Sequence, residues 1–358
     1  MPSLKEIKGR INSISSTLAI TSAMKMVAAA KLQKAQMAIQ NMLPYERRLH
    51  SMLIDLMGAM NISAAASEDG SARGSGSAER GFDQSGDRLS LSNRHDLAGM
   101  DGAYSLMAQR EVRKVAIVAF ASNSSLCGAF NSNAIREATA VINEYRASGL
   151  GDADITVYSV GRKMAEAMKK LGFPSPADFT KMSDSPSYDA ASALAQELFD
   201  GFVSGRFDKV ELVYNHYKST SSQPTTRQTY LPLSLADATA DIQVGKITDS
   251  ASESDTNRGA EPVGAPVVRQ GSPTTEDLIV EPSKEELIAT LLPKVVRLRV
   301  FTTLLDSTAA EQAARTVAMQ LATDNGNDLL QELTLEYNKG RQQKITSEIL
   351  DLVGGSMQ

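Results

Sequence analysis

The feature of this sequence that most constrains its fold is an apolar heptad repeat that begins at Leu4 and runs to Met60. Apolar side chains fill most first and fourth heptad positions: Leu4, Ile7, Ile11, Ile14, Leu18, Ala28, Leu32, Ala35, Ile39, Met42, Leu49, Leu53, Leu56 and Met60. A helix of this span would be about 80 Å long, more than a compact domain requires. Such sustained periodicity is typical of a coiled coil, and Pro44 is expected to bend the helix.

A second long helical pattern occupies the other end of the chain. Ser283 is a cap for the segment KEELIATLL, and apolar residues then recur at helical spacing to Leu352, over a length of roughly 100 Å. Pro293 predicts a kink near its start. Two such helices can bury both apolar stripes at once by packing against each other. We therefore expect an antiparallel coiled coil, with contacts between positions such as Leu18 and Ala314.

The segment 323–355 keeps a helical pattern almost to the terminus. Thr323 or Asp324 is a candidate cap for a helix start, and Gly354 with Gly355 provides a stop. Apolar residues continue between these signals, which predicts an ordered tail that buries one face against another surface.

Between the two helical ends, expected strands alternate with expected helices. The strands are VRKVAIVAF (112–120), DITVYSV (154–160) and KVELVYNHY (209–217). This alternation predicts a parallel sheet with right-handed crossovers, in a Rossmann-like α/β domain. The segment TTRQTYLPL adds an edge strand, whose end tolerates Pro232.

These patterns divide the chain into five parts. Two segments rich in Ser, Gly, Ala and charged residues are expected to be flexible insertions between ordered parts. The fold class is α/β, and the parts are an N-terminal coiled-coil helix (1–62), an insertion (63–104), the α/β domain (105–235), a second insertion or linker (236–282) and a C-terminal coiled-coil helix (283–358).

Composition excludes several classes of function. A net charge of -5 argues against a nucleic-acid binder, because neutralising phosphates requires an excess of Lys and Arg. The single cysteine, Cys127, excludes an internal disulfide and a multi-cysteine zinc site. The start MPSLKEIKGRI resembles neither a signal peptide nor a presequence, and there is no long apolar run. We expect a cytoplasmic protein, or one peripheral to the cytoplasmic side of a membrane.

One turn is the best candidate for a ligand-binding or catalytic site. Residues 122–131, SNSSLCGAFN, follow the first strand and precede a helix, where α/β sheets often bind phosphate. The turn matches neither phosphate-loop motif, so an ordered turn with a buried Cys127 is favoured. A nucleophilic cysteine needs a basic partner, yet His50, His95 and His216 are scattered along the chain. We therefore expect no catalytic residue, cofactor site or metal site.

The first helix carries an excess of basic residues. This excess predicts a basic face and an acidic partner, although a solvated helix face is an equally good interpretation of the pattern alone. Within residues 1–45 the basic residues are Lys5, Lys8, Arg10, Lys25, Lys31 and Lys34, against the single acid Glu6.

Both termini carry a family resemblance. The segments MPSLKEIKGRINSISSTLAITSAMKMVAAAKLQKAQ and EQAARTVAMQLATDNGNDLLQELTLEYNKGRQQKITSEILDLVGG closely resemble the gamma subunit of F-type ATP synthases, the central rotor stalk. The resemblance extends more weakly to SLCGAFN and LIVEPSKEELIATLL, and covers about three quarters of the chain. It implies a coiled coil inside the ring of alpha and beta subunits, and a foot that touches the epsilon subunit and the c-ring. It implies one copy per complex, no active site on this chain and membrane association only through the c-ring.

The resemblance also implies contact residues. Met24 and Lys25 would lie near an acidic lever of the beta subunit, and Arg341, Gln342 and Thr346 would meet its catch loops. We add Lys31 and Lys34 as point charges for the same lever. The apolar residues of the tip would bury surface in a sleeve without fixing a rotational angle, because hydrophobic attraction has no direction. They are Ile345, Ile349, Leu352 and Val353.

The sequence departs from the family pattern in three places. The turn of the family commonly reads Ser/Thr-Asp-Arg-Gly-Leu-Cys-Gly, and here Asn123 and Ser124 replace its Asp-Arg pair. Gly340 stands where alanine is usual, a change of roughly 1 kcal/mol in helix propensity. The two insertions are long for a bacterial gamma subunit. Two other classes remain alternatives: a nucleotide-binding α/β enzyme with helical dimerisation arms, and a coiled-coil scaffold unrelated to rotation.

Overall fold

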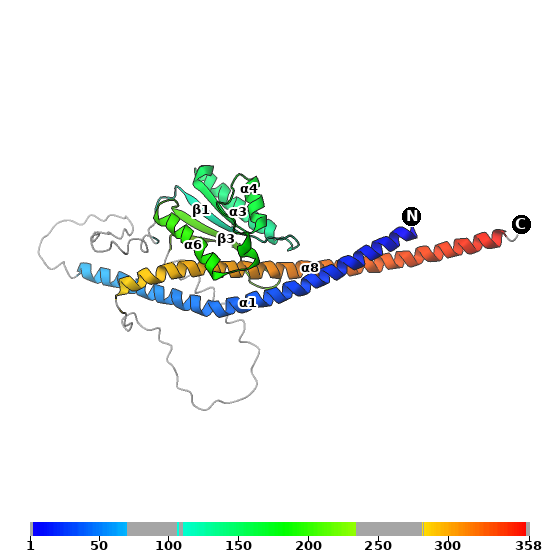
Figure 1. Ribbon diagram of the computed structural model, residues 1–358, viewed down its shortest axis with the longest axis horizontal. Helices are drawn as coiled ribbons and strands as arrows, with labels where there is room; N and C mark the ends of the chain where they lie inside the picture. Colours follow the sequence, from blue (N-terminus) through cyan, green and yellow to red (C-terminus); the bar gives the residue numbers. More distant parts are fainter. Residues whose placement is uncertain (1–2, 70–105, 107–109, 234–280, 282, 356–358) are drawn as a thin grey trace, which may run out of the picture.

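The computed structural model of the chain describes residues 3–69, 106, 110–233, 281 and 283–355. Two long helices, α1 (Leu4–Asp69) and α8 (Lys284–Gly355), lie side by side and form a rod. An α/β domain lies against one side of this rod, close to α8 and towards the end away from both termini (Figure 1). Most of both predicted insertions, residues 70–104 and 236–280, lies outside the described residues.

The predicted antiparallel coiled coil is confirmed, and three contacts define its register. They are Leu4 with Gly340, Leu18 with Gly326, and Thr21 with Thr323. The two leucines are separated by as many residues along α1 as the two glycines are in the opposite direction along α8. Such equal and opposite steps are the signature of an antiparallel pair.

Details of the two helices differ from the expectation. The predicted partnership of Leu18 with positions such as Ala314 is wrong, because Leu18 packs against Gly326 while Ala314 packs beside Cys127 and Phe130 of the domain. Helix α1 continues to Asp69, beyond its expected end at residue 62. Pro44 and Pro293 both lie inside continuous helices.

The start and end of α8 follow from local chemistry. Ser283 caps the helix as predicted, because its hydroxyl oxygen accepts a hydrogen bond from the Glu286 backbone N–H at 3.2 Å. The alternative start at Thr323 is wrong: this residue lies inside the helix, and its hydroxyl donates to the Met319 carbonyl at 2.8 Å. The helix ends at Gly355, within the predicted double-glycine stop.

The domain contains a four-stranded sheet in the order β2-β1-β3-β4. The strands are β1 (Val115–Phe120), β2 (Ile155–Val160), β3 (Lys209–Asn215) and β4 (Thr225–Leu231). Strand β1 pairs in parallel with β2 and β3, and β4 pairs antiparallel with β3 at the edge of the sheet. The predicted parallel sheet with an added edge strand is therefore confirmed.

Helices cover both faces of this sheet. The domain's helices of more than one turn are α3 (Phe130–Ala147), α4 (Arg162–Lys170), α5 (Thr180–Asp184) and α6 (Tyr188–Val203). Alternate residues of β1 point to opposite faces, so that Val115, Ile117 and Ala119 pack with α3 and α4. Ala116, Val118 and Phe120 pack instead in a cluster that contains residues of α6 and α8.

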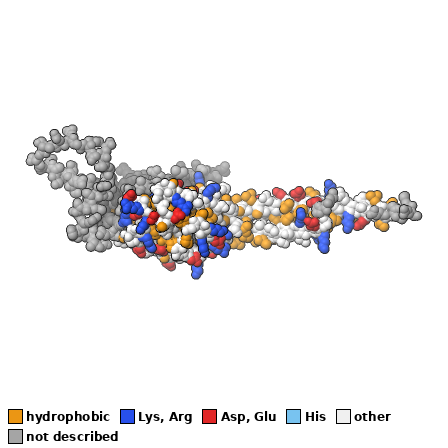
Figure 2. All heavy atoms as spheres, turned by 90° about the horizontal axis from the view of Figure 1, so that it is seen from above, with side chains coloured by type: hydrophobic (Ala, Val, Ile, Leu, Met, Phe, Trp, Pro, Cys, Tyr) orange, Lys and Arg blue, Asp and Glu red, His pale blue; other side chains and the backbone are white. Residues whose placement is uncertain are grey.

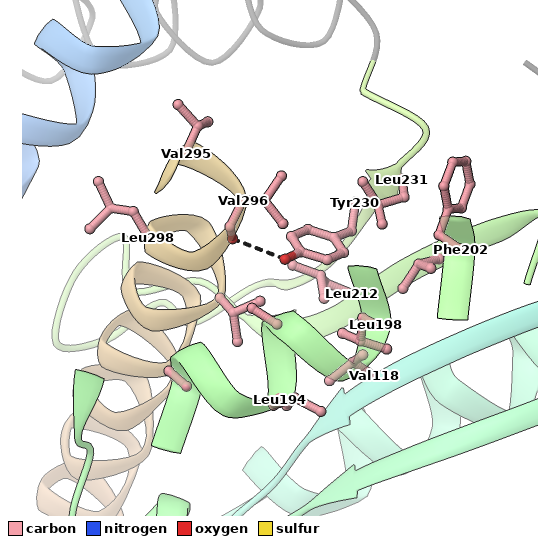
Figure 3. Close-up of a cluster of buried hydrophobic side chains, with 14 of the residues drawn as sticks. Val118, Leu194, Leu198, Phe202, Leu212, Tyr230, Leu231, Val295, Val296 and Leu298 are labelled. Carbon is pink, nitrogen blue, oxygen red and sulfur yellow. Dashed lines mark hydrogen bonds between the residues drawn. The ribbon is translucent and has the colours of Figure 1, made fainter. Parts of the chain in front are cut away.

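The first turns of α8 therefore belong to the core of the domain. Leu292, Val296 and Val300 of α8 are almost fully buried in the cluster that contains the sheet and α6. Figure 3 shows Tyr230 of β4 reaching this helix, where its hydroxyl donates to the Val296 carbonyl at 2.9 Å. Shaft and domain thus share one hydrophobic core, and a rotation of the domain must carry α8 with it.

Candidate functional site

The ten predicted contact residues lie on the rod and outside the α/β domain, in two groups. Met24 and Lys25 of α1 are half-buried, while Lys31 and Lys34 are exposed. The second group, at the end of α8, is fully on the surface: Arg341, Gln342, Ile345, Thr346, Ile349 and Leu352.

The structure does not bring these two groups together. Gly340, next to Arg341, faces Leu4, and Lys25 lies a further 21 residues along α1. At about 1.5 Å per residue, roughly 30 Å of rod separates Arg341 from Lys25. The two groups are therefore separate surfaces, able to meet different parts of a partner.

The three lysines of the first group do not form the single basic face that the sequence predicts. Lys25 and Lys34 are nine residues apart, which is about two and a half helical turns, so they leave α1 on opposite sides. Lys31 and Lys34 are one turn apart and share a side. The positive charge of this region therefore lies on two sides of α1.

Beyond Gly340, α8 continues without a neighbouring helix. Because α1 begins at Leu4, opposite Gly340, the last part of α8 from Arg341 to Gly355 projects as a single helix (Figure 1). We call this part, residues 341–355, the tip. A single helix of this length is marginal in water without a packing partner.

The tip exposes apolar surface. The side chains of Ile345, Ile349 and Leu352 are 48%, 54% and 74% exposed, and Leu350 and Val353 are exposed beside them. Figure 2 shows hydrophobic side chains along the narrow part of the rod, away from the charged surface of the domain. Within the described part of the chain nothing covers this face, and its predicted burial against another surface stays a prediction. Exposed apolar surface of this kind is typical of a region that binds another molecule.

Polar groups of the tip lie between the apolar ones. The Thr346 hydroxyl donates to the Gln342 carbonyl at 2.9 Å, so its oxygen is left to accept a hydrogen bond from a partner. Lys344 and Glu348 form an exposed pair at 3.8 Å. Arg341 extends a planar guanidinium into solvent, which suits a carboxylate or a carbonyl of a partner.

A second arrangement lies where the domain meets α8. In open α/β sheets, ligands bind at the carboxyl ends of neighbouring strands whose connections leave in opposite directions. Here that position is the junction of β1 and β3, and α8 fills it. Cys127 and Phe130, after β1, pack on Ala310, and a Cβ on Gly128 would lie 3.7 Å from the Ala318 Cβ. The fold's customary ligand crevice is occupied by the chain's own shaft.

The turn after β1 is ordered as the sequence predicts. Leu126 and Gly128 have positive φ angles of 67° and 59°, which reverse the chain before α3. The Asn131 side chain accepts a hydrogen bond from the Ser122 backbone N–H at 3.0 Å and holds the two ends of the turn together. Cys127 is 1% exposed, which agrees with a structural thiol.

Two polar contacts made by charged side chains of α8 join this helix to the crevice, and sequence reasoning missed both. Asp306 accepts the Tyr217 backbone N–H at 2.9 Å and lies 2.6 Å from His216 Nδ1. Arg315 donates to the Ser125 carbonyl at 2.7 Å and to Glu311 at 2.6 Å. The only available signal was a Glu-x-x-x-Arg pair within the alanine-rich segment AAEQAARTVA.

The surroundings of His216 and Glu311 shift the pKa values of both side chains. The hydrogen bond to Asp306 raises the pKa of His216, although burial of the ring opposes the shift. Burial raises the pKa of Glu311, and the Arg315 guanidinium offsets only part of that effect. His216–Asp306 joins the end of β3 to α8, and Arg315, which is paired with Glu311 on the same helix, joins α8 to Ser125 of the turn after β1.

Among the residues that the structure describes, no group of three or more His, Cys, Asp and Glu side chains is arranged to hold a metal ion. In the same residues, no helix combines the length and apolarity needed to cross a membrane.

The architecture defines the class of protein: a long two-helix shaft, firmly joined to an α/β domain whose ligand crevice the shaft itself fills. The family model described as ATP synthase matches residues 3–357. The ATP synthase gamma chain of Phocaeicola vulgatus is 47% identical over 357 residues, and that of Bacteroides thetaiotaomicron is 45% identical over 358; each alignment covers 100% of both chains. The chain therefore belongs to the ATP synthase gamma chain family.

Solved structures agree on the fold. A chain from the Euglena gracilis mitochondrial ATP synthase, in a structure of OSCP, F1 and c-ring, has a TM-score of 0.54. The match covers 99% of this chain and 93% of that one at 18% identity. A second Euglena gracilis structure, of the rotor, has a TM-score of 0.51 at 18% identity and covers 96% of this chain and 98% of that one. These similarities confirm the expected combination of terminal coiled coil and α/β domain.

Proposed function

We propose that this chain is the central rotor shaft of an F-type ATP synthase, which couples ion flow through the membrane c-ring to ATP synthesis or hydrolysis at the alpha and beta subunits. As a gamma chain it is a non-catalytic subunit. The observation that carries the proposal is the tip: a single helix that continues past the end of α1 and exposes the apolar side chains of Ile345, Ile349 and Leu352.

The placement of polar and apolar groups on the tip suits a turning part. Arg341, Gln342 and Thr346 offer directional hydrogen bonds, which form only at certain rotational angles. Ile345 and Ile349 offer apolar surface, whose burial depends on area and hardly on angle. A shaft that must pause at a few positions and slide between them needs both kinds of contact.

The shared core of α8 and the sheet supports the other half of the mechanism. The α/β domain is broad and lies at the end of the shaft opposite the tip (Figure 1). A force that turns the domain is passed to α8 through Leu292, Val296 and Tyr230, and then along the coiled coil. We propose that the domain contacts the c-ring and the epsilon subunit, at the cytoplasmic face of a bacterial inner membrane.

The partner assignment is tested by co-purification. The tagged chain, expressed with the other subunits, should be recovered with three alpha and three beta subunits and one epsilon per gamma. Recovery as a self-associated coiled coil without alpha and beta would contradict the proposal and favour a scaffold. Saturable binding of a nucleotide to the isolated chain would favour the enzyme alternative.

The role of the tip is tested by Arg341→Ala combined with Gln342→Ala in the assembled complex. We expect the rate of ATP hydrolysis to fall while the yield of complex is kept. The matched control is Lys339→Ala with Gln343→Ala, which removes one cation and one amide from exposed neighbours on the same helix. A loss of assembly with normal specific activity, or equal losses of activity in both variants, would rule out a specific role for Arg341 and Gln342.

A further inference from the structure

The ionic contact at the end of β3 joins three parts of the molecule at one point. Asp306 of α8 holds the strand end through two groups, the Tyr217 backbone N–H at 2.9 Å and His216 Nδ1 at 2.6 Å. The Tyr217 hydroxyl in turn accepts a hydrogen bond from the Gln36 side chain of α1 at 2.6 Å. The sheet, α8 and α1 therefore meet at this contact, which we call the joint.

The joint differs from three other polar contacts between domain and shaft because one of its partners is a histidine. Tyr230 donates to the Val296 carbonyl, Arg315 to the Ser125 carbonyl and Arg297 to the Gln196 side chain; none of these groups changes its protonation between about pH 6 and pH 9. Histidine is the side chain whose charge changes in this range. The strength of the joint must therefore depend on pH.

Few charged groups influence the pKa of the His216 imidazole. Among the described residues these are Asp306 of α8, which favours the charged ring, and Lys218 of the turn after β3, which disfavours it. Helix α1 contributes the uncharged amide of Gln36. The hydrogen bond to Asp306 outweighs burial and Lys218, so that the pKa of His216 is raised. The charged form of the ring therefore persists to higher pH than it would without Asp306.

We propose that His216 and Asp306 form a proton-controlled clamp between the α/β domain and the shaft, tight while the imidazole is charged and weaker once it is neutral. The inference goes beyond the proposed function, since it concerns how firmly the domain is held rather than what the shaft contacts. His216 and Asp306 are positioning residues: they hold the β3 end on α8 and touch no substrate. Above the raised pKa of His216, the β3 end should open more often, while the shared apolar core keeps the fold intact.

The direction of the pH dependence follows from the raised pKa of His216. A group whose folded-state pKa is raised contributes stability below its unfolded pKa, and that contribution is lost as pH rises through the folded value. The Tyr217 amide reports this directly, because its hydrogen exchanges only when the bond to Asp306 opens. The His216 side chain is 42% exposed, so screening by solvent limits the expected change to about fivefold.

The experiment is hydrogen exchange of the peptide that contains the Tyr217 amide, measured in the assembled complex at about pH 6 and about pH 9 and corrected for intrinsic exchange rates. The wild-type chain should be protected about fivefold more at the lower pH. His216→Lys keeps a charge at both values and should lose the pH difference while staying protected. His216→Gln should be weakly protected at both. The control Glu166→Gln alters an exposed pair on α4 and should behave like the wild type.

The clamp is ruled out if the wild-type protection is independent of pH, or if the pH difference persists in His216→Gln. Should His216→Gln fail to assemble, Asp306→Asn provides the second test. The asparagine oxygen still accepts the Tyr217 N–H but carries no charge, so the pH difference should disappear there too. A persistent difference in Asp306→Asn would overturn the proposal. Because exchange is measured without turnover, these outcomes are separate from those that test the rotor function.

Discussion

Two glycines of α8 face leucines of α1 in equivalent ways, yet the structure predicts opposite outcomes for their replacement by alanine. A Cβ on Gly326 would lie 2.7 Å from Leu18 Cδ2 and 3.1 Å from Leu18 Cγ. A Cβ on Gly340 would lie 3.1 Å from Leu4 Cδ2 and would meet no second atom of that side chain within 4 Å. The two sites lie on the same helix, which makes each a control for the other.

Whether alanine stabilises or destabilises the fold at each site depends on the gain in helix propensity and the cost of the steric contact. Replacing a helical glycine with alanine gains about 1 kcal/mol of helix propensity in both cases. At Gly340 a single terminal methyl group of Leu4, in the first turn of α1, must move by a few tenths of an ångström, so about 0.5 kcal/mol of the gain should survive. At Gly326 the branch point of Leu18 is also blocked, and overpacking of about 2 kcal/mol exceeds the gain. Gly326→Ala should be destabilising by about 1 kcal/mol.

The assay is urea unfolding of the full chain, followed by circular dichroism at the helical band. Gly340→Ala should raise the free energy of unfolding and Gly326→Ala should lower it. In a Leu18→Ala background the leucine is gone, so Gly326→Ala should stabilise by about 1 kcal/mol, as propensity alone dictates. Equal stabilisation by both single replacements in the wild-type background would refute the close approach of Leu18 to α8.

Two further predictions concern buried charges. Arg315→Ala should lower the free energy of unfolding by about 3 kcal/mol, because Glu311 then stays buried without its cation, whereas Arg315→Met with Glu311→Leu should recover most of the loss in the same urea assay. Burial raises the pKa of Glu211, but hydrogen bonds from Arg227, Lys209 and Tyr145 outweigh it and hold the pKa below its usual value. The stability from Glu211 is thus present above its ordinary pKa of about 4.3 and is lost as pH falls further, and Glu211→Gln should flatten the acid limb of a stability–pH curve.

The long-range architecture was predictable because its signals are periodic. The heptad repeat that starts at Leu4 requires an apolar partner, and so does the helical pattern that ends near Leu352. Each helix can bury its apolar stripe against the other. The β-branched strands with helices between them defined the parallel sheet in the same way. Periodicity does not determine register, however, since two apolar stripes can pair at several different offsets along the helices. Leu18 packs on Gly326 instead of the expected region of Ala314.

The contacts between domain and shaft could not be predicted, because no local pattern contains them. Asp306 and His216 lie 90 residues apart in sequence, and each looks like an ordinary surface residue in its own segment. Their meeting depends on how α8 crosses the ends of β1 and β3, which is a property of the whole fold. Glu311 and Arg315 gave a local signal, a helical pair one turn apart, but burial of that pair became visible only with the domain in place.

The occupied crevice explains why this α/β domain suits a rotor. A sheet of this topology leaves a hollow at the carboxyl ends of β1 and β3, and in a ligand-binding protein that hollow must stay open. Here the apolar contact of Ala310 with Phe130 and the ionic contacts of Asp306 and Arg315 close it around a helix. The domain thereby grips α8 both at its sheet face, through the shared core, and at its strand ends. Two attachments at different points along one helix resist twisting better than either alone, which is what the transmission of torque from domain to tip requires.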